Sequence, residues 1–151
     1  MAADAPTVHA SVVLTGERAV LIRGPAGSGK SRLAFALIQA GEAGLIPFAR
    51  LVADDRVQLQ AAHGRLLARP PSSLAGLLEI RGLGIRRLAY EPVAVVGLVI
   101  DLAAADAGRL PSPESRQTEI DGIALPRLAV ATGSDALPLV LAEFGTVAAV
   151  D

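Results

Sequence analysis

Short apolar runs, separated by glycine, proline and charged residues, extend over most of this 151-residue chain. Runs of roughly four to eight residues rich in valine and isoleucine are typical of strands, whereas apolar positions three and four apart are typical of a helix. By these criteria strands are predicted at residues 8–14, 18–23, 50–53, 57–60, 65–68, 77–83, 94–102 and 123–130. Helices are predicted at residues 31–40 and 135–150.

The stretches between these elements are rich in glycine, proline and small polar residues, as loops usually are. Thr15-Gly16-Glu17 predicts an antiparallel hairpin of the first two strands, and Gly41 is expected to end the first helix. His63-Gly64 indicates a further turn, and residues 103–119 a mobile, Pro-rich connection. Because the pattern shows no repeat and no second-domain boundary, it predicts one α/β domain over residues 1–151, with a mixed sheet.

Composition narrows the class of protein. Apolar residues make up 52% of the chain but aromatic residues only 3%, so the core must be aliphatic. A net charge of −1 provides no electrostatic basis for binding nucleic acid or an anionic membrane. The longest apolar stretch, residues 92–100, is far too short to span a bilayer. The absence of cysteine excludes disulfides and thiolate metal sites, and we expect a cytoplasmic protein.

A glycine-rich loop lies between the strand at 18–23 and the helix at 31–40. It has the sequence Gly24-Pro25-Ala26-Gly27-Ser28-Gly29-Lys30-Ser31, which fits the phosphate-wrapping pattern G-x-x-x-x-G-K-[ST]. Lys30 is the only lysine in the chain, whereas there are thirteen arginines. A lysine is expected in such a loop because its compact ammonium can enter a ring of backbone amides, for which the planar guanidinium of arginine is too wide. The helix N-terminus adds partial positive charge. The loop predicts a nucleoside triphosphate site, with Lys30 on the outer phosphates and Ser31 on Mg²⁺, the alternative being a flexible turn.

Two adjacent carboxylates, Asp54 and Asp55, follow the predicted strand at 50–53. Phosphoryl transfer needs a carboxylate for the metal and a group that orients or deprotonates the attacking oxygen. Because neighbouring residues on an extended chain point to opposite faces, one can serve the site and the other can support it. A solvated turn is the alternative. His9 lies near the same end of the sheet if its strand pairs with the next as a hairpin, and is otherwise an ordinary strand-end histidine.

The segment Glu79 to Ile85 carries an acid, an arginine and two glycines. On a strand, Glu79 and Arg81 share one side, so that Glu79 can complete the Mg²⁺ shell and Arg81 can stabilise charge on the transferred phosphoryl group. Gly82 and Gly84 allow a sharp bend or the close approach of a partner. An exposed ion pair followed by a bend explains the same residues equally well.

Together, in this order, these segments resemble the catalytic domain of bacterial HPr kinase/phosphorylase. The resemblance rests on His9 at fifteen residues before Gly24, the loop 24–31, the run Leu51-Val52-Ala53-Asp54-Asp55, and the run Leu78-Glu79-Ile80-Arg81-Gly82-Leu83-Gly84-Ile85. The last run is close to the signature of that family. The resemblance implies a P-loop α/β fold akin to the nucleotide domain of phosphoenolpyruvate carboxykinase, and a homo-oligomer, commonly a hexamer.

The same resemblance implies an ATP- and Mg²⁺-dependent serine kinase that acts on HPr, the phosphocarrier protein of the sugar phosphotransferase system. The family also runs the reverse reaction, in which inorganic phosphate attacks phosphoserine to give pyrophosphate. By position, Lys30 would hold the β- and γ-phosphates, and Ser31 and Glu79 would hold Mg²⁺. Asp55 would take the serine proton with His9 and Asp54 nearby, or the two aspartates would exchange these roles.

The chain also departs from the family pattern. Thr132-Gly133-Ser134-Asp135 stands where the family has Pro-Gly-Arg-Asn, so the arginine of that loop is missing, and Arg127 is close in sequence but does not match the motif. Arg32 follows the loop serine, where the family usually has an acidic residue. With no domain ahead of the catalytic one, and a C-terminal helix cut short after about Glu143, the chain resembles the short form of the family.

Two other functions remain open. One is a small P-loop kinase or NTPase with a small-molecule substrate, although a GTPase is excluded because the base-reading Asn-Lys-x-Asp motif needs a second lysine. The other is a regulator that binds nucleotide without catalysis, which the missing loop arginine favours. Transfer of labelled phosphate to HPr, turnover with a small acceptor, and binding without turnover distinguish the three.

Overall fold

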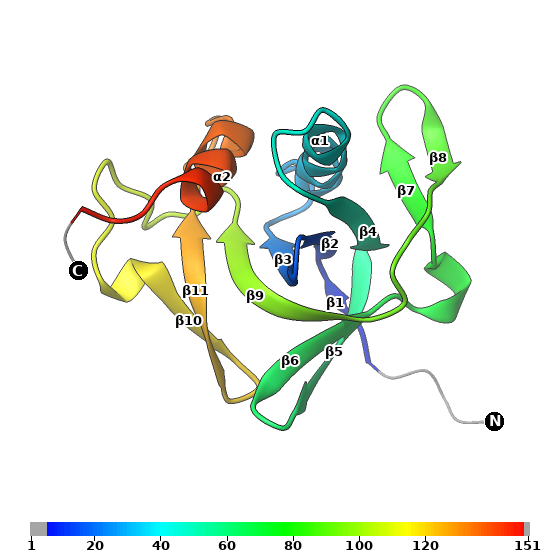
Figure 1. Ribbon diagram of the computed structural model, residues 1–151, viewed down its shortest axis with the longest axis horizontal. Helices are drawn as coiled ribbons and strands as arrows, with labels where there is room; N and C mark the ends of the chain where they lie inside the picture. The colour runs from blue at the N-terminus through cyan, green and yellow to red at the C-terminus, as the bar shows by residue number, and fades with distance from the viewer. Residues whose placement is uncertain (1–5, 150–151) are drawn as a thin grey trace.

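The computed structural model describes residues 6–149. Its elements are, in chain order, β1 (Val8–His9), β2 (Ser11–Thr15), β3 (Arg18–Arg23), α1 (Lys30–Glu42), β4 (Ala49–Ala53), β5 (Arg56–Ala62), β6 (Arg65–Arg69), β7 (Leu77–Ile80), β8 (Gly84–Arg87), β9 (Ala94–Asp101), β10 (Gln117–Ile120), β11 (Ile123–Ala129) and α2 (Ala136–Gly145). Short 3₁₀ turns lie at Ser72–Leu74 and Glu114–Arg116. The architecture is mixed α/β, with both helices over one face of a curved sheet (Figure 1).

The main sheet has the strand order β1-β5-β6-β9-β3-β2-β4, and the β10–β11 pair joins it beside β9. Strand β9 runs parallel to both β3 and β11, while β2 is antiparallel to β3 and to β4. It follows that β3, β4, β9 and β11 all end at the same edge of the sheet. This edge carries the glycine-rich loop after β3 and the two aspartates after β4.

Strand β9 changes its neighbour along its length. Its first residues, Ala94 and Val95, pair with β6, whereas Val99–Asp101 pair with β11. The sheet therefore curls around its helix-free face, where a second hydrophobic cluster is enclosed that includes Leu21, Leu66 and Val99. The predicted buried strand at 94–102 is confirmed, and it holds the two halves of the sheet together.

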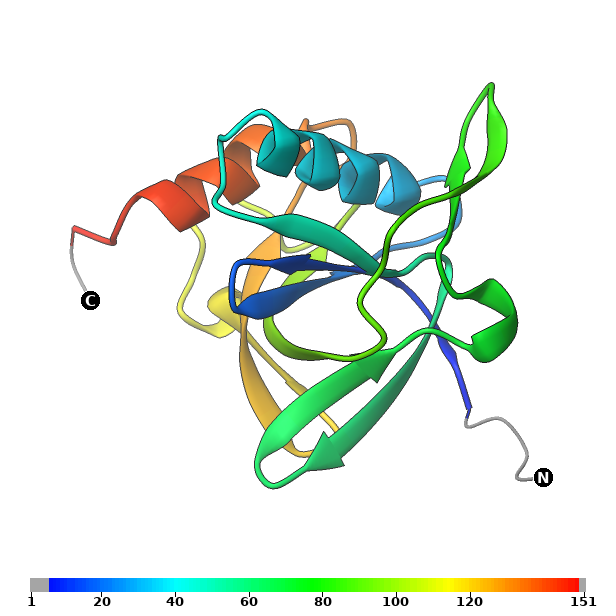
Figure 2. The same ribbon diagram turned by 45° about the vertical axis from the view of Figure 1, so that its right-hand side comes forward.

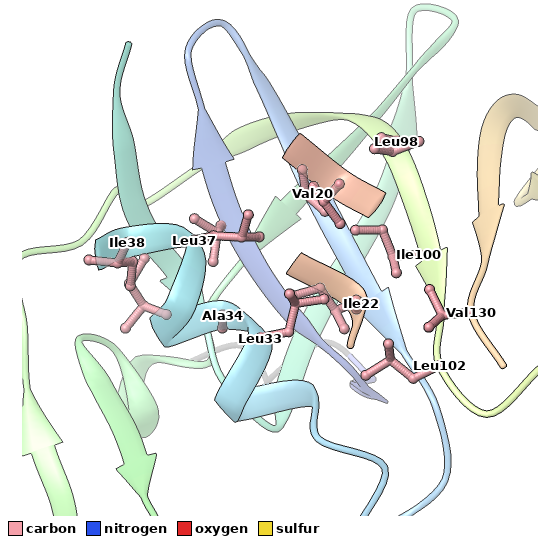
Figure 3. Close-up of a cluster of buried hydrophobic side chains, with 14 of the residues drawn as sticks. Val20, Ile22, Leu33, Ala34, Leu37, Ile38, Leu98, Ile100, Leu102 and Val130 are labelled. Atoms are coloured by element: carbon pink, nitrogen blue, oxygen red, sulfur yellow. The ribbon is translucent and has the colours of Figure 1, made fainter. Parts of the chain in front are cut away.

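The first core cluster lies between the helices and the sheet (Figure 3). Leu33, Ala34, Leu37 and Ile38 recur three and four residues apart on α1, so they form one buried stripe against the sheet. Burying each large aliphatic side chain contributes about 1.5–3 kcal/mol. The hydrophobic residues buried among those described are aliphatic, as the composition predicted.

Helix α1 extends past its predicted end. Gly41 lies inside the helix and does not end it. A glycine is required at this position because the neighbouring strand is so close that a Cβ there would come within 2.7 Å of the Cβ of Ala49. The chain leaves the helix at Gly44, which has a left-handed φ of 77°. At the other end of the chain, α2 begins at a cap in which Asp135 accepts a hydrogen bond from Leu137 N. It ends at Gly145, so residues 146–149 are not helical as predicted, and residue 150 of the predicted helix lies outside the described residues.

Two predicted strands differ from the structure, and two observed strands were not predicted. The strand predicted at 8–14 is broken at Ala10, whose amide donates to Asp55 O, so that β1 pairs with β5 and only β2 forms the hairpin with β3. The strand predicted at 77–83 ends at Ile80. Strand β8 was not predicted, because Gly84–Arg87 lacks an apolar pattern. Strand β10 begins at Gln117, inside the segment 103–119 that was expected to be a mobile connection, and ends at Ile120.

None of the helices in the described part of the chain is long and apolar enough to cross a membrane.

Candidate active site

The glycine-rich loop connects the last residue of β3 to the first residue of α1. Gly29 precedes the helix with a φ of 100°, a conformation that favours glycine, and no side chain caps the helix start. The first amides of α1 are therefore left without intrahelical acceptors, at the end where the helix dipole is positive. Gly24 is closely packed for a different reason, since a Cβ there would meet Ser28 Oγ and would come within 3.1 Å of Leu102 Cβ.

Two polar groups of the loop fit a bound phosphate. The ammonium of Lys30 curls back over the loop and donates to Gly24 O at 2.8 Å and to Pro25 O at 3.2 Å. Ser28 Oγ is buried and has no hydrogen-bond partner within residues 6–149. A buried hydroxyl without a partner is uncommon, and a phosphate oxygen inside the loop would satisfy it. The residues present therefore fit a polyphosphate.

Asp54 is the central residue of the site. The residue is only 7% exposed, yet its carboxylate oxygens accept three hydrogen bonds from different elements. Ser11 Oγ and Ser31 Oγ each donate to Oδ1 at 2.7 Å, and Glu79 N donates to Oδ2 at 3.1 Å. A buried carboxylate needs such partners, and they hold it in one orientation next to the loop hydroxyl. The pair of Ser31 and Asp54 has the oxygen chemistry that Mg²⁺ prefers.

Ser11 was not singled out in the sequence. The sequence signal was a hydroxyl directly before the apolar run Val12-Val13-Leu14 of a predicted strand, and in the structure Ser11 is completely buried. A buried hydroxyl on a core strand must find an acceptor. That acceptor is Asp54, 43 residues away in the chain.

Asp55 lies beside Asp54 but has the opposite environment. The chain is not extended here, because Asp55 has a left-handed φ of 68°, a conformation that Asp tolerates better than most residues. The bend leaves the side chain of Asp55 67% exposed, with its Oδ1 at 3.9 Å from His9 Nδ1. One carboxylate is thus buried and bonded, whereas the other is free at the surface next to an exposed histidine.

The remaining predicted residues lie on the β7–β8 hairpin. Glu79 is exposed on β7, and only its backbone amide contacts Asp54. Arg81 lies in the turn after β7, not on the strand, so the expectation that both side chains share one strand face was wrong. Neither side chain makes an ion pair in the described part of the molecule. No group of three or more His, Cys, Asp or Glu positioned for a metal is found in residues 6–149, but Mg²⁺ usually takes one or two carboxylates with phosphate oxygens and water.

The family model described as the HPr Serine kinase C-terminal domain matches residues 1–132. The chain belongs to this family. HPr kinase/phosphorylase of Geobacillus thermodenitrificans is 38% identical over 140 residues, covering 83% of this chain and 43% of that protein. HPr kinase/phosphorylase of Clostridium beijerinckii is 40% identical over 78 residues, covering 52% of this chain and 24% of that protein. The chain therefore spans less than half the length of these curated relatives.

A solved structure supports the fold of this HPr kinase C-terminal domain. The HPr(Ser) kinase/phosphatase from Coxiella burnetii matches with a TM-score of 0.72 and 30% identity, over 90% of this chain and 91% of that one. The mixed sheet with helices on one face is thus the fold of an HPr kinase catalytic domain.

An ion-pair network lies next to the loop of this HPr kinase domain. Arg23, the residue before Gly24, donates through Nε to Asp101 Oδ1 at 2.7 Å and through Nη2 to Oδ2 at 2.8 Å. Arg127 also donates to Asp101, and it binds Asp106 through two nitrogens at 2.8 and 3.0 Å. The network joins the ends of β3, β9 and β11 to the segment at 103–116.

The hydrogen bonds of the network also shift the pKa values of its members. Burial by itself would raise the pKa of Asp101, but hydrogen bonds from Arg23 and Arg127 outweigh it and lower the pKa below its ordinary value. Hydrogen bonding from Arg127 lowers the pKa of Asp106, and the same bonds raise the pKa of the Arg127 guanidinium. Arg127 is therefore already held by two carboxylates, so it is not a free substitute for the loop arginine that the family has and this chain lacks.

Proposed function

We propose that this domain is an ATP-dependent kinase that phosphorylates a serine of HPr. One observation carries the assignment of roles: two adjacent aspartates, one buried and bonded to the loop serine, the other exposed beside His9. A kinase that uses a metal needs one fixed carboxylate and one that is free to exchange a proton. Family membership supports the choice of HPr as acceptor, and the matched fold supports a catalytic domain.

In this proposal the loop amides and Lys30 bind the β- and γ-phosphates of ATP. Ser31 and Asp54 hold Mg²⁺, together with Glu79, and the metal neutralises the negative charge of the phosphates when it is bound. The Asp55 carboxylate accepts the proton of the serine hydroxyl, and the serine oxygen then bonds to the γ-phosphorus while the bond from that phosphorus to ADP breaks. Arg81 stabilises the transferred group, and His9 helps to position Asp55.

The reverse reaction uses the same groups. An oxygen of inorganic phosphate attacks the phosphorus of phosphoserine, and the bond from that phosphorus to the serine oxygen breaks. Asp55 returns a proton to the serine oxygen, and the new P–O–P bond gives pyrophosphate. We expect the protein to act in the cytoplasm as a homo-oligomer, by resemblance to the family. These expectations are independent of the assignment of the aspartates.

The test combines the purified protein, ATP labelled at the γ-phosphate, Mg²⁺ and HPr. Label on a serine of HPr supports the proposal. Label on a small acceptor, or release of phosphate without transfer, supports a small-molecule kinase or NTPase. Adding phosphate and unlabelled phosphoserine-HPr, and measuring pyrophosphate, tests the reverse reaction.

A second candidate is a regulator that binds nucleotide without transferring phosphate. The specific observation in its favour is that the loop arginine is missing and that Arg127 is bound by Asp101 and Asp106. Tight ATP binding with no transfer and no hydrolysis in the same experiment would establish this function instead.

A further inference from the structure

The phosphate loop is fixed at its two ends by different carboxylates. At its end, Ser31 donates to Asp54, whereas directly before its beginning Arg23 donates to Asp101 through two nitrogens. The two carboxylates lie on opposite sides of the loop, because in the sheet β9 is on one side of β3, and β2 and β4 are on the other. Asp54 belongs to the candidate active site, but the proposed reaction makes no use of Asp101 and its partners.

The chain bends sharply after β9, next to the beginning of the loop. Leu102 N donates to Arg23 O at 2.8 Å, and Leu102 Cβ is 3.1 Å from the point that a Cβ on Gly24 would occupy. The next residue, Ala103, has a left-handed φ of 53°. This conformation is unfavourable for a residue with a Cβ, so the bend persists only because its surroundings hold it.

Two contacts hold the far side of the bend. Ala104 N donates to Val130 O at 2.9 Å, and the Asp106 carboxylate accepts hydrogen bonds from two nitrogens of Arg127 at 2.8 and 3.0 Å. The side chain of Arg127 is a fixed support, because it is only 13% exposed and also donates to Asp101. Asp106 is therefore the side chain that secures the bend to β11.

An ion pair near the surface can also serve stability alone, and the Asp106 side chain is 52% exposed. That role explains the pair with Arg127, but it does not explain a left-handed alanine where the chain touches the phosphate loop. Backbone strain of this kind is concentrated at functional sites. The segment between β9 and β10 lies on the opposite side of the molecule from the β7–β8 hairpin (Figures 1 and 2), so it supports the loop from the side that Asp54 does not reach.

We propose that Asp106 is a positioning residue for nucleotide binding, because its pair with Arg127 holds the strained bend at Ala103. The bend in turn fixes Gly24, whose carbonyl oxygen accepts a hydrogen bond from Lys30 Nζ at 2.8 Å. A shift of the bend therefore displaces the loop amides and the ammonium together. The proposal rests on the proposed nucleotide site, and Asp106 acts on that site through the protein, not by contact with ATP.

The test measures ATP affinity by isothermal calorimetry, well below the melting temperature of each variant. Asp106→Ala should raise Kd for ATP about three- to tenfold. Glu119→Ala is the matched control, because Glu119 is an exposed acid on the adjacent strand β10, and it should bind ATP as the wild type does. A role in stability alone would lower the fraction of folded protein, which reduces the number of binding sites and leaves Kd unchanged.

A second variant tests the route through the bend. Glycine adopts a left-handed φ without strain, so adding Ala103→Gly to Asp106→Ala should return Kd toward the wild-type value. If the double variant binds as weakly as Asp106→Ala, the role of Ala103 is overturned. An unchanged Kd in Asp106→Ala, with a wild type that binds ATP, would overturn the positioning role and leave the nucleotide site intact. A wild type that binds no ATP would overturn both together.

Discussion

Ser31 Oγ lies 2.7 Å from Asp54 Oδ1, so the first turn of α1 and the end of β4 meet through a single hydrogen bond. Ser11 Oγ, from β2, donates to the same carboxylate oxygen. The carboxylate thus fixes the phosphate loop relative to two strands that are distant from it in sequence. Because Asp54 is buried, each of these bonds also compensates for the loss of hydration.

Removing Ser11 should therefore affect both stability and activity. We expect Ser11→Ala to lower the free energy of unfolding by about 1–3 kcal/mol, because Asp54 loses a partner where water does not replace it. Transfer to HPr should slow as the carboxylate loses its orientation. Thermal denaturation and kcat are the measurements, and Ser73→Ala, at an exposed serine, is the control. An unaltered melting temperature would contradict the assigned role of Ser11.

Asp55 should matter for transfer and little for stability. Its side chain is mostly exposed, so Asp55→Asn should alter the free energy of unfolding by less than about 0.5 kcal/mol. The amide cannot accept the serine proton, so the transfer rate should fall by about 10²–10⁴-fold while ATP still binds. Single-turnover transfer and calorimetric ATP binding separate the two effects. Normal transfer by Asp55→Asn would show that another group is the base.

Lys30 tests the shape of the phosphate site. Lys30→Arg keeps the charge but introduces a planar group that is too wide for the ring of amides, so ATP affinity should fall by about tenfold or more, equivalent to about 1.4 kcal/mol. Isothermal calorimetry measures the affinity. Arg32→Lys makes the opposite exchange at an exposed neighbouring position and should leave the affinity unchanged. Equal affinity of wild type and Lys30→Arg would mean that charge alone is recognised.

Gly24 tests the close packing of the loop. A methyl group at this position would meet Ser28 Oγ and would come within 3.1 Å of Leu102 Cβ, so Gly24→Ala should displace the loop and weaken ATP binding. Gly108→Ala is the control, since the nearest atom to a Cβ there is 3.9 Å away. Titration with a fluorescent ATP analogue measures both variants. Equal affinities would show that the loop tolerates the added methyl group.

Asp101 should determine part of the acid stability. Because folding lowers its pKa, its contribution is complete above the unfolded value of about 3.9 and is lost as the pH falls through the lower folded value. Asp101→Asn should therefore cost about 1–3 kcal/mol at pH 7 and should flatten the loss of stability below pH 4. Urea denaturation from pH 7 to pH 2 measures this. Parallel curves for the two proteins would contradict the role of Asp101.

Local patterns predicted much of the fold. The β2–β3 hairpin, the succession of strand, loop and helix around Lys30, and the buried strand near residue 100 all follow from residues that are close in sequence. Strands β8 and β10 were missed because their short segments carry charged and polar side chains, and pairing with a neighbouring strand stabilises them. Arg81 was placed on a strand because the pattern does not show where the chain bends.

The sequence by itself determined the family, the phosphate loop and the identity of the candidate acids, because each depends on residue types within a short window. Only the tertiary structure decided how these residues combine. Ser11 meets Asp54 across 43 residues, and Arg23 meets Asp101 across 78, through strands whose order in the sheet differs from their order in the chain. A hydrogen bond depends on distance and direction in space, and these are set by the packing of the whole sheet, which no local pattern contains.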